Sequence, residues 1–231
     1  MDLDNAYAKL KADGFLGWGG PDAVRRLEGW TKLLVRLARE EWLPEPPARL
    51  HELGCGNGIL SLLAAERGYS ISGTDLSQQA VNWARERFTR AGLNGRFYRG
   101  DVCTMPLIED GALDVVIDGN CIHCLFDQDR QRCLREVRRV LGEHGVFIVS
   151  TMCGPPKSEE AIGRYDASRQ CLMRDGRPHR TLKPAREIEV ELAEAGFLVV
   201  NRQKSANAWW DHLTIVARPA SGVEKSCGAI L

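Results

Sequence analysis

A glycine-rich segment between a predicted strand and a predicted helix constrains the fold of this chain more than any other feature. It reads His51-Glu52-Leu53-Gly54-Cys55-Gly56-Asn57-Gly58. Glycine allows a tight turn and lets a ligand approach the backbone closely. Amide groups at the start of the following helix can donate hydrogen bonds to a negatively charged group. The segment therefore predicts an α/β domain that binds a ligand at this turn.

Two common nucleotide-binding patterns do not fit this segment. A dinucleotide fingerprint needs its third glycine at position 59, which is occupied by Ile59. A Walker loop needs a Gly-Lys pair followed by Ser or Thr, and none follows here. An oxidoreductase that uses a nicotinamide cofactor is therefore a disfavoured alternative.

From residue 48 onward the chain alternates short apolar strands with helical segments, which predicts a largely parallel sheet covered by helices. The predicted strands cover residues 49–53, 69–74, 96–99, 113–117, 145–150, 197–201 and 213–217. The predicted helices of this region cover residues 59–67, 77–91, 128–141 and 184–194. The connection between the last two strands is loop-like, so we expect them to pair antiparallel.

We expect three parts along the chain. Residues 1–47 form an N-terminal helical lid or flank, whose amphipathic helix at 21–42 ends before a proline-rich linker. Residues 48–220 form the main domain, and residues 221–231 a C-terminal tail. Within the main domain, residues 151–183 interrupt the alternation and contain an Asp-Gly hairpin signal. We expect this insertion to cap the crevice at the carboxyl ends of the strands.

The composition argues against several classes of partner. Thirty-one basic residues balance 31 acidic ones, so no overall field attracts nucleic acid or an anionic membrane, and we expect neither as a partner. No apolar run approaches the roughly 18 residues needed to span a bilayer. The polar N-terminal segment lacks the apolar core of a signal peptide, which predicts a cytoplasmic protein. The eight cysteines are then expected to be free thiols.

Two carboxylates follow the second and third predicted strands. Asp75 ends the second strand, and Asp101 follows the third. A carboxylate at the first position can accept two charge-assisted hydrogen bonds from a ribose diol. A carboxylate at the second position is suited to an adenine amino group, with Leu76 and Val102 on the two sides of the flat base. Together they predict a nucleoside ligand.

With these features in place, residues 48–150 resemble the class I S-adenosylmethionine-dependent methyltransferases of the small-molecule type. The chain departs from the usual Pro-Gly-Gly turn of that family at Glu143-His144-Gly145, which lies in a loop. The matching segments occur in family order and are Glu52–Gly58, Asp75–Ser77, Gly100–Val102, Leu113–Asp118, Leu134–Leu141 and Gly145–Val149.

The resemblance implies a Rossmann-like, seven-stranded, mostly parallel sheet with an antiparallel last strand, and S-adenosyl-L-methionine as cofactor. It implies that Gly54 and Gly56 flank the methionine part and that Asp75 holds the ribose hydroxyls. Glu52 either contacts the cofactor or only orients the loop. The remaining implied cofactor-binding residues are Cys55, Leu76, Asp101 and Val102, with the backbone of Asp118 and Gly119.

The segment after the fourth strand, at residues 118–124, bears on the acceptor. It lacks the Asn/Asp-Pro-Pro-Tyr/Phe motif of methyltransferases that act on amide or adenine nitrogens, so nucleic-acid and glutamine methylation are disfavoured. His123 is a candidate catalytic base or positioning group; the alternative is a histidine that packs under the cofactor or caps a helix. Asn120 is a second candidate. The expected function is in-line methyl transfer to a small molecule, leaving S-adenosylhomocysteine.

Several alternatives concern the acceptor. A cysteine-rich rim would suit a thiol or a metalloid such as arsenic, whereas a non-catalytic module would only bind the cofactor. The pair Cys121 and Cys124 lacks a second ligand pair, so no metal site is expected. Arginines at residues 164–186 either favour a carboxylate-bearing acceptor or form a solvated face. The rim cysteines are Cys55, Cys103, Cys121, Cys124 and Cys153.

Overall fold

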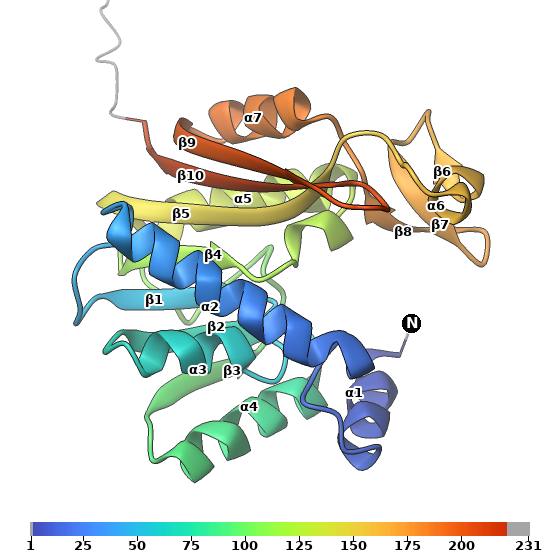
Figure 1. The fold of residues 1–231 in the computed structure, drawn as a ribbon. Coiled ribbons are helices and arrows are strands. Elements are labelled where there is room, and N and C mark those ends of the chain that lie inside the picture. The colour runs from blue at the N-terminus through green and yellow to red at the C-terminus, as the bar shows by residue number, and fades with distance from the viewer. Residues whose placement is uncertain (1, 221–231) are drawn as a thin grey trace, which may run out of the picture.

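The computed structural model describes residues 2–220, and the predicted tail at 221–231 lies outside them. Its central sheet consists of β1 (Arg49–Leu53), β2 (Ser70–Asp75), β3 (Gly95–Arg99), β4 (Leu113–Asp118), β5 (Leu141–Cys153), β9 (Phe197–Ala206) and β10 (Asp211–Pro219). The strand order is β3-β2-β1-β4-β5-β10-β9 (Figure 1). Strands β1 to β5 pair in parallel, and β10 is antiparallel to both of its neighbours. The predicted Rossmann-like sheet, mostly parallel with an antiparallel last strand, is confirmed.

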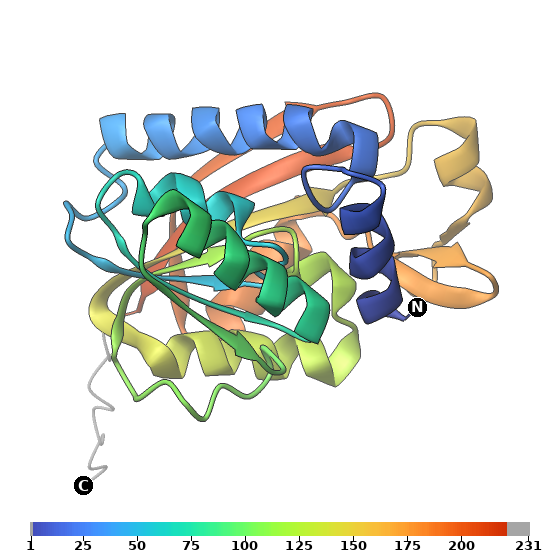
Figure 2. The same cartoon turned by 90° about the horizontal axis from the view of Figure 1, so that it is seen from below.

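Helices cover both faces of the sheet (Figures 1 and 2). The helices on one face are α2 (Ala23–Arg39), α3 (Ile59–Ala65) and α4 (Gln78–Ala91), and those on the other are α5 (Asp127–Val140) and α7 (Ala185–Glu194). A short 3-10 helix, η1 (Gly20–Asp22), precedes α2. The helix predicted at 21–42 is therefore shorter at both ends.

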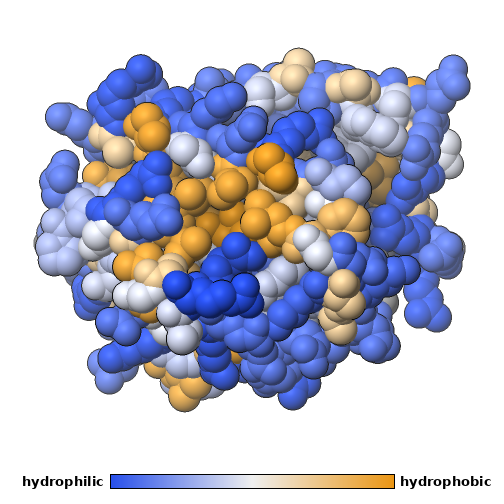
Figure 3. Space-filling model, turned by 60° about the horizontal axis from the view of Figure 1, so that its bottom comes forward, coloured by the Kyte–Doolittle hydropathy of each residue, from blue (hydrophilic) through white to orange (hydrophobic). Residues whose placement is uncertain are grey.

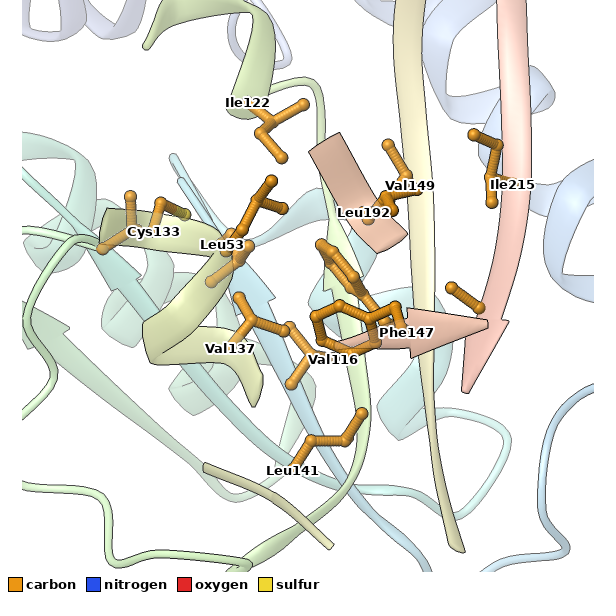
Figure 4. Packing of buried hydrophobic residues seen from close by; sticks show 14 of the residues in the cluster. Leu53, Val116, Ile122, Cys133, Val137, Leu141, Phe147, Val149, Leu192 and Ile215 are labelled. Atoms are coloured by element: carbon orange, nitrogen blue, oxygen red, sulfur yellow. The ribbon is translucent and has the colours of Figure 1, made fainter. Parts of the chain in front are cut away.

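Alternation along the central strands divides the core between the two faces. In β4, Val115 and Ile117 belong to the cluster under α2 to α4, whereas Val116 packs on the α5 side. Strand β5 repeats the pattern, so that Phe147 and Val149 join Val116 against α5 and α7 (Figure 4). Both faces of these strands are buried, as expected for parallel strands between two helical layers.

Strand β5 is longer than predicted, because β10 pairs with it from Phe147 to Cys153. The insertion after it therefore starts at residue 154. It contains α6 (Glu159–Gly163), β6 (Tyr165–Asp166), β7 (Cys171–Arg174) and β8 (Arg177–Thr181). The three strands form a small separate sheet in the order β6-β7-β8. Asp175 and Gly176, with φ of 50° and 71°, make the predicted hairpin turn between β7 and β8.

The N-terminal segment contains a helix outside the predicted helical ranges, α1 (Leu3–Ala12). It lies beside the N-terminal end of α4, at the edge where the parallel strands end (Figure 2). Asp4 makes this contact, because its Oδ1 accepts from Ser77 Oγ at 2.6 Å and from Gln79 N at 3.1 Å. Tyr7 is the one side chain of α1 that is buried. Leu3, Ala6, Tyr7 and Leu10 nevertheless recur at helical spacing and all line the cavity described below, so the sequence does contain a pattern for this helix.

Some apolar side chains remain on the surface. Val24 and Val35 of α2 are 57% and 52% exposed. Figure 3 shows hydrophobic side chains near the centre of one face, surrounded by hydrophilic ones. Such exposure is common on globular proteins, and we assign no site to this face. Within residues 2–220, no helix is both long and apolar enough to cross a bilayer.

Candidate functional site

A cavity of about 1500 Å³ opens at the carboxyl ends of the parallel strands. Its walls come from α1, the start of α2, the loops after β1 to β4, the cap formed by residues 154–183, and the turn between β9 and β10. Pockets for one small ligand usually measure about 300–1000 Å³. The cavity therefore has room for two ligands side by side.

The glycine loop after β1 has left-handed backbone at Gly54 and Gly56, with φ of 59° and 53°. A Cβ atom on Gly54 would lie 2.7 Å from Cys121 Cβ, and one on Gly56 would lie 2.8 Å from Tyr7 Oη. Both the backbone conformation and the space therefore require glycine. Cys55 is 3% exposed, and its amide donates to Thr74 O at 3.0 Å. The backbone of this loop lines the cavity.

Asp75, at the end of β2, is 8% exposed and lines the cavity. Its Oδ2 accepts from Gly56 N at 2.9 Å, and its Oδ1 accepts from Ser77 N at 2.8 Å. Burial raises the pKa of this carboxyl, and the two amide hydrogen bonds oppose that shift. Each oxygen has a second acceptor site, so Asp75 fixes the glycine loop and can still accept from a ligand.

Glu52 lies at the inner end of the cavity and is 4% exposed. Its Oε2 accepts from Ser61 N at 2.9 Å and from Ser61 Oγ at 2.5 Å. Its Oε1 is packed against Gly119, where a Cβ atom would approach to 2.6 Å. Burial raises the pKa of Glu52 to about 8. Glu52 thus both orients the loop region and presents a titratable group to the cavity.

The residues expected to hold a flat base lie together at the rim. Leu76 is 57% exposed and Val102 is buried, and both line the cavity. Asp101 also lines it, and its Oδ1 accepts from Cys103 N at 2.9 Å. The structure thus brings an exposed leucine, a buried valine and a carboxylate to the same cavity.

The turn after β4 is anchored by Asp118, which is fully buried. Its Oδ1 accepts from Cys121 N at 2.7 Å and from Ile122 N at 2.9 Å, and burial raises its pKa to about 6. The next two residues, Gly119 and Asn120, line the cavity, and Asn120 adopts a positive φ of 70°. The structure thus places the side chain of Asp118 behind the turn, whereas Gly119 and Asn120 face the ligand space.

His123, in the 3-10 helix η2 (Ile122–Cys124), lines the cavity and is 6% exposed. Its Nδ1 is buried without a hydrogen-bond partner among residues 2–220. Burial, with nearby Arg180 and His212, lowers the pKa of His123 well below its ordinary value. The imidazole is therefore neutral at physiological pH. Thr181 Oγ1 donates to the His123 carbonyl at 3.3 Å, which fixes η2 against the cap.

Sequence patterns missed Tyr7, which covers the glycine loop from α1. Its ring lies 5.1 Å from that of Trp18. The segment around Trp18 is tied to the loop, because Asn57 Nδ2 and Arg87 Nη2 donate to Leu16 O at 2.8 and 2.7 Å. The N-terminal residues thus roof the cavity at its glycine-loop end.

The opposite half of the cavity is basic. Arg180 from β8, Arg26 from α2 and His212 from β10 line it together with His123. Arg26 and His212 were not expected at the site, because each belongs to an element far from the glycine loop in sequence and carries no motif. The cap arginines Arg164 and Arg174 also line the cavity.

The cysteines do not form a reactive rim. Burial raises the pKa of Cys55, Cys121 and Cys124, so these thiols stay protonated. Thiolate, not thiol, is the form that binds soft elements. No cluster of His, Cys, Asp or Glu suited to a metal occurs within residues 2–220. The thiol or metalloid alternative is therefore unsupported.

Comparison with known proteins agrees with this geometry. Residues 51–145 match the model of a family described as a methyltransferase domain. The ribosomal RNA small subunit methyltransferase C of Alcanivorax borkumensis is 30% identical over 123 residues, 53% of this chain and 35% of that protein. The demethylmenaquinone methyltransferase of Thermus thermophilus is 32% identical over 130 residues, 55% of this chain and 56% of that protein. The chain spans only 28% to 56% of the first curated relatives that it matches.

A solved structure shows the same fold. An S-adenosylmethionine-dependent methyltransferase from Methanosarcina mazei superposes with a TM-score of 0.71 at 20% identity, over 80% of this chain and 98% of that one. The seven-stranded sheet and the glycine loop are the features expected of the methyltransferase domain that the family model matches. Residues 51–145 therefore match a methyltransferase domain, and the described chain has the fold of a solved S-adenosylmethionine-dependent methyltransferase.

Proposed function

We propose that this protein transfers a methyl group from S-adenosylmethionine to a small-molecule acceptor bound in the same cavity. One observation carries the proposal: a single cavity of about 1500 Å³ joins the glycine loop and Asp75 to His123 and the cap. Its two halves differ in charge. Glu52, Asp75 and Asp101 lie at the ends of the parallel strands, whereas the cap and α2 contribute arginines; Asp13 and Asp22 of the N-terminal segment also line the cavity.

The first half fits the cofactor. Asp75 offers acceptor sites for ribose hydroxyls, Leu76 and Val102 offer the two sides of a slot for adenine, and Gly54 leaves backbone open beside the methionine part. We propose contacts from Glu52, Cys55, Asp101, and the backbone of Asp118 and Gly119 as well. The bound cofactor supplies a methyl group on a sulfonium; the acceptor atom bonds to that carbon as the carbon–sulfur pair returns to sulfur, leaving S-adenosylhomocysteine.

The second half is suited to an acceptor of limited size. The names of the matched relatives range from ribosomal RNA to a menaquinone precursor, so relatives alone do not select the acceptor. Here the N-terminal segment and the cap both line the cavity, which favours a small molecule over nucleic acid or a membrane. Its basic lining favours a carboxylate-bearing acceptor. The seven described cysteines are free, which supports a cytoplasmic location.

The protein contributes alignment and a hydrogen-bonding group. Holding donor and acceptor in line can supply roughly 7–11 kcal/mol of barrier reduction. His123 has a neutral ring with an unpartnered Nδ1, so it can position the acceptor through a hydrogen bond, whereas its lowered pKa disfavours its holding a proton. Asn120 lies on the same turn and can orient the acceptor. No observation favours a non-catalytic binding module over this reaction.

The proposal is tested by calorimetry with S-adenosylhomocysteine and by methyl transfer from labelled S-adenosylmethionine to a small-molecule library. We expect saturable cofactor binding at one site and transfer to at least one small acceptor. Absence of binding, or a thermal shift with NADH and none with S-adenosylhomocysteine, would contradict the proposed function.

Cofactor affinity should rise with pH because of Glu52. The pKa of Glu52 is raised to about 8, so the carboxyl is protonated in the free protein at pH 7. The positively charged amino group of the cofactor favours the carboxylate, and binding therefore releases a proton. Affinity for S-adenosylhomocysteine should increase by up to about tenfold per pH unit below pH 8 and level off above it.

Calorimetry at pH 6.5, 7.5 and 8.5 measures this dependence, and Glu52→Gln provides the matched comparison. The glutamine keeps an oxygen for Ser61 but cannot titrate, so its profile should be nearly flat. An equally steep profile in Glu52→Gln would show that another group releases the proton.

A further inference from the structure

Arg180 presents an unpaired guanidinium to the acceptor half of the cavity. It lies on β8, is half-buried and lines the cavity. Its Nη1 donates to the carbonyl of His179 at 2.8 Å, and no Asp or Glu oxygen within residues 2–220 lies within 4 Å of it. An arginine has five N–H donors, so most of those on Arg180 remain available to a ligand.

The other cavity arginines are placed differently. Arg164 is paired with Glu160 at 3.0 Å and donates to Met173 O, and Arg25 is paired with Asp22 at 3.2 Å. Arg174 is exposed and is unpaired among the described residues. Arg26 is also unpaired there, and burial lowers its pKa, but it lies on α2 near Asp22 and not on the cap. Arg180 is thus the unpaired, half-buried arginine of the described cap.

Positive charges act on the groups around Arg180, and no acid among residues 2–220 forms an ion pair with it. Its charge lowers the pKa of His123 and of His179, and Arg26 contributes to the lowered pKa of His123 and His212. Glu52, Asp75 and Asp101 line the cavity at the ends of the parallel strands, and the other two lining acids, Asp13 and Asp22, come from the N-terminal segment, where Asp22 pairs with Arg25. A partly desolvated cation among neutral histidines is stabilised by an anionic ligand.

An apolar surface lies directly beside this cation. Leu172 on β7 is the register partner of Arg180 on β8. Leu172 packs in one cluster with Met152 and Trp210, and all three line the cavity. A ligand with an apolar body and a charged end would thus bury its body here while the charge meets the guanidinium.

We propose that Arg180 binds a carboxylate of the acceptor and thereby places the acceptor's apolar body beside His123. This assignment rests on the proposed function and names its substrate class. Guanidinium matches the planar carboxylate with paired N–H groups, which a lysine cannot reproduce. Arg180 is therefore a specificity-determining residue of the acceptor site.

The test compares 2-naphthoate with its neutral analogue 2-naphthamide, using ligand-detected NMR on protein saturated with S-adenosylhomocysteine. We expect the wild-type protein to bind naphthoate at least about tenfold more tightly than naphthamide. Arg180→Gln should remove this preference, and Arg180→Lys should retain only part of it. Arg177→Gln is the matched control, because Arg177 lies on the same strand, is exposed, and is outside the cavity lining.

Equal affinities in the wild-type protein, no naphthoate binding at all, or a full preference in Arg180→Gln would each overturn the assignment. The melting temperature and the S-adenosylhomocysteine affinity of Arg180→Gln should equal those of the wild-type protein. These two measurements are the control for folding of the variant. Failure of the wild-type protein to bind S-adenosylhomocysteine would instead contradict the proposed function, and the two failures are thereby distinguished.

Discussion

Asp75→Ala is expected to weaken binding of S-adenosylhomocysteine by at least about 30-fold, equivalent to about 2 kcal/mol. The carboxylate would accept hydrogen bonds from the ribose hydroxyls, and it also accepts from the amides of Gly56 and Ser77. Alanine removes the ligand contact and releases the glycine loop together. Asp75→Asn should behave similarly, because the NH₂ group of asparagine would face one of those two backbone donors. Calorimetry at pH 7.5 measures the loss.

Asp114→Ala is the matched control for this prediction. Asp114 is also an aspartate on a central strand, but it pairs with Arg49 at the opposite end of β4 and does not line the cavity. Its replacement should leave cofactor affinity within about twofold of wild type. If Asp75→Ala and Asp114→Ala bound the cofactor equally well, the ribose site would have to lie elsewhere.

Gly54→Ala is expected to lower the free energy of unfolding by about 2–5 kcal/mol and to abolish cofactor binding at millimolar concentration. A left-handed backbone costs a residue with a Cβ about 1–2 kcal/mol. The added Cβ would also lie 2.7 Å from Cys121 Cβ, and such overpacking costs a further 1–3 kcal/mol or so. Relief of the clash would shift the loop that lines the cavity. Urea unfolding followed by circular dichroism gives the stability change.

Gly92→Ala separates the cost of a left-handed backbone from the cost of steric overlap at the added Cβ. Gly92 has a similar φ of 66°, but a Cβ there meets no atom within 4 Å. This variant should lose only about 1 kcal/mol and should bind the cofactor normally. Equal destabilisation of Gly54→Ala and Gly92→Ala, with cofactor binding retained in both, would show that the glycine loop has no steric role.

The arrangement of the sheet could be predicted because parallel strands between helices leave a strong pattern. β1 has the predicted bounds, β2 is shifted by one residue at both ends, and β3 begins one residue earlier than predicted. Strands β9 and β10 extend well beyond prediction, since the exposed, charged residues from Arg202 to Ser205 show no apolar alternation. Their pairing is decided by neighbouring strands, which local sequence does not encode.

The site residues likewise fall into a group that the sequence could predict and a group that it could not. Glu52, Asp75 and Asp101 could be placed together because the carboxyl ends of parallel strands meet at one edge of the sheet. Tyr7, Arg26 and His212 could not, because α1, α2 and β10 carry no site motif and bring these residues to the cavity only through tertiary packing. The proposed roles of His123 and Asn120 stay predictions, although both residues line the cavity.

The central claim is that S-adenosylmethionine lies across the ends of β1, β2 and β3. A crystal structure of the protein grown with S-adenosylhomocysteine tests it most directly. We predict adenine between Leu76 and Val102, ribose hydroxyls on the Asp75 carboxylate, and the sulfur atom facing the half lined by His123 and Arg180. Density for the ligand outside this cavity, or an empty cavity at saturating ligand, would contradict the account.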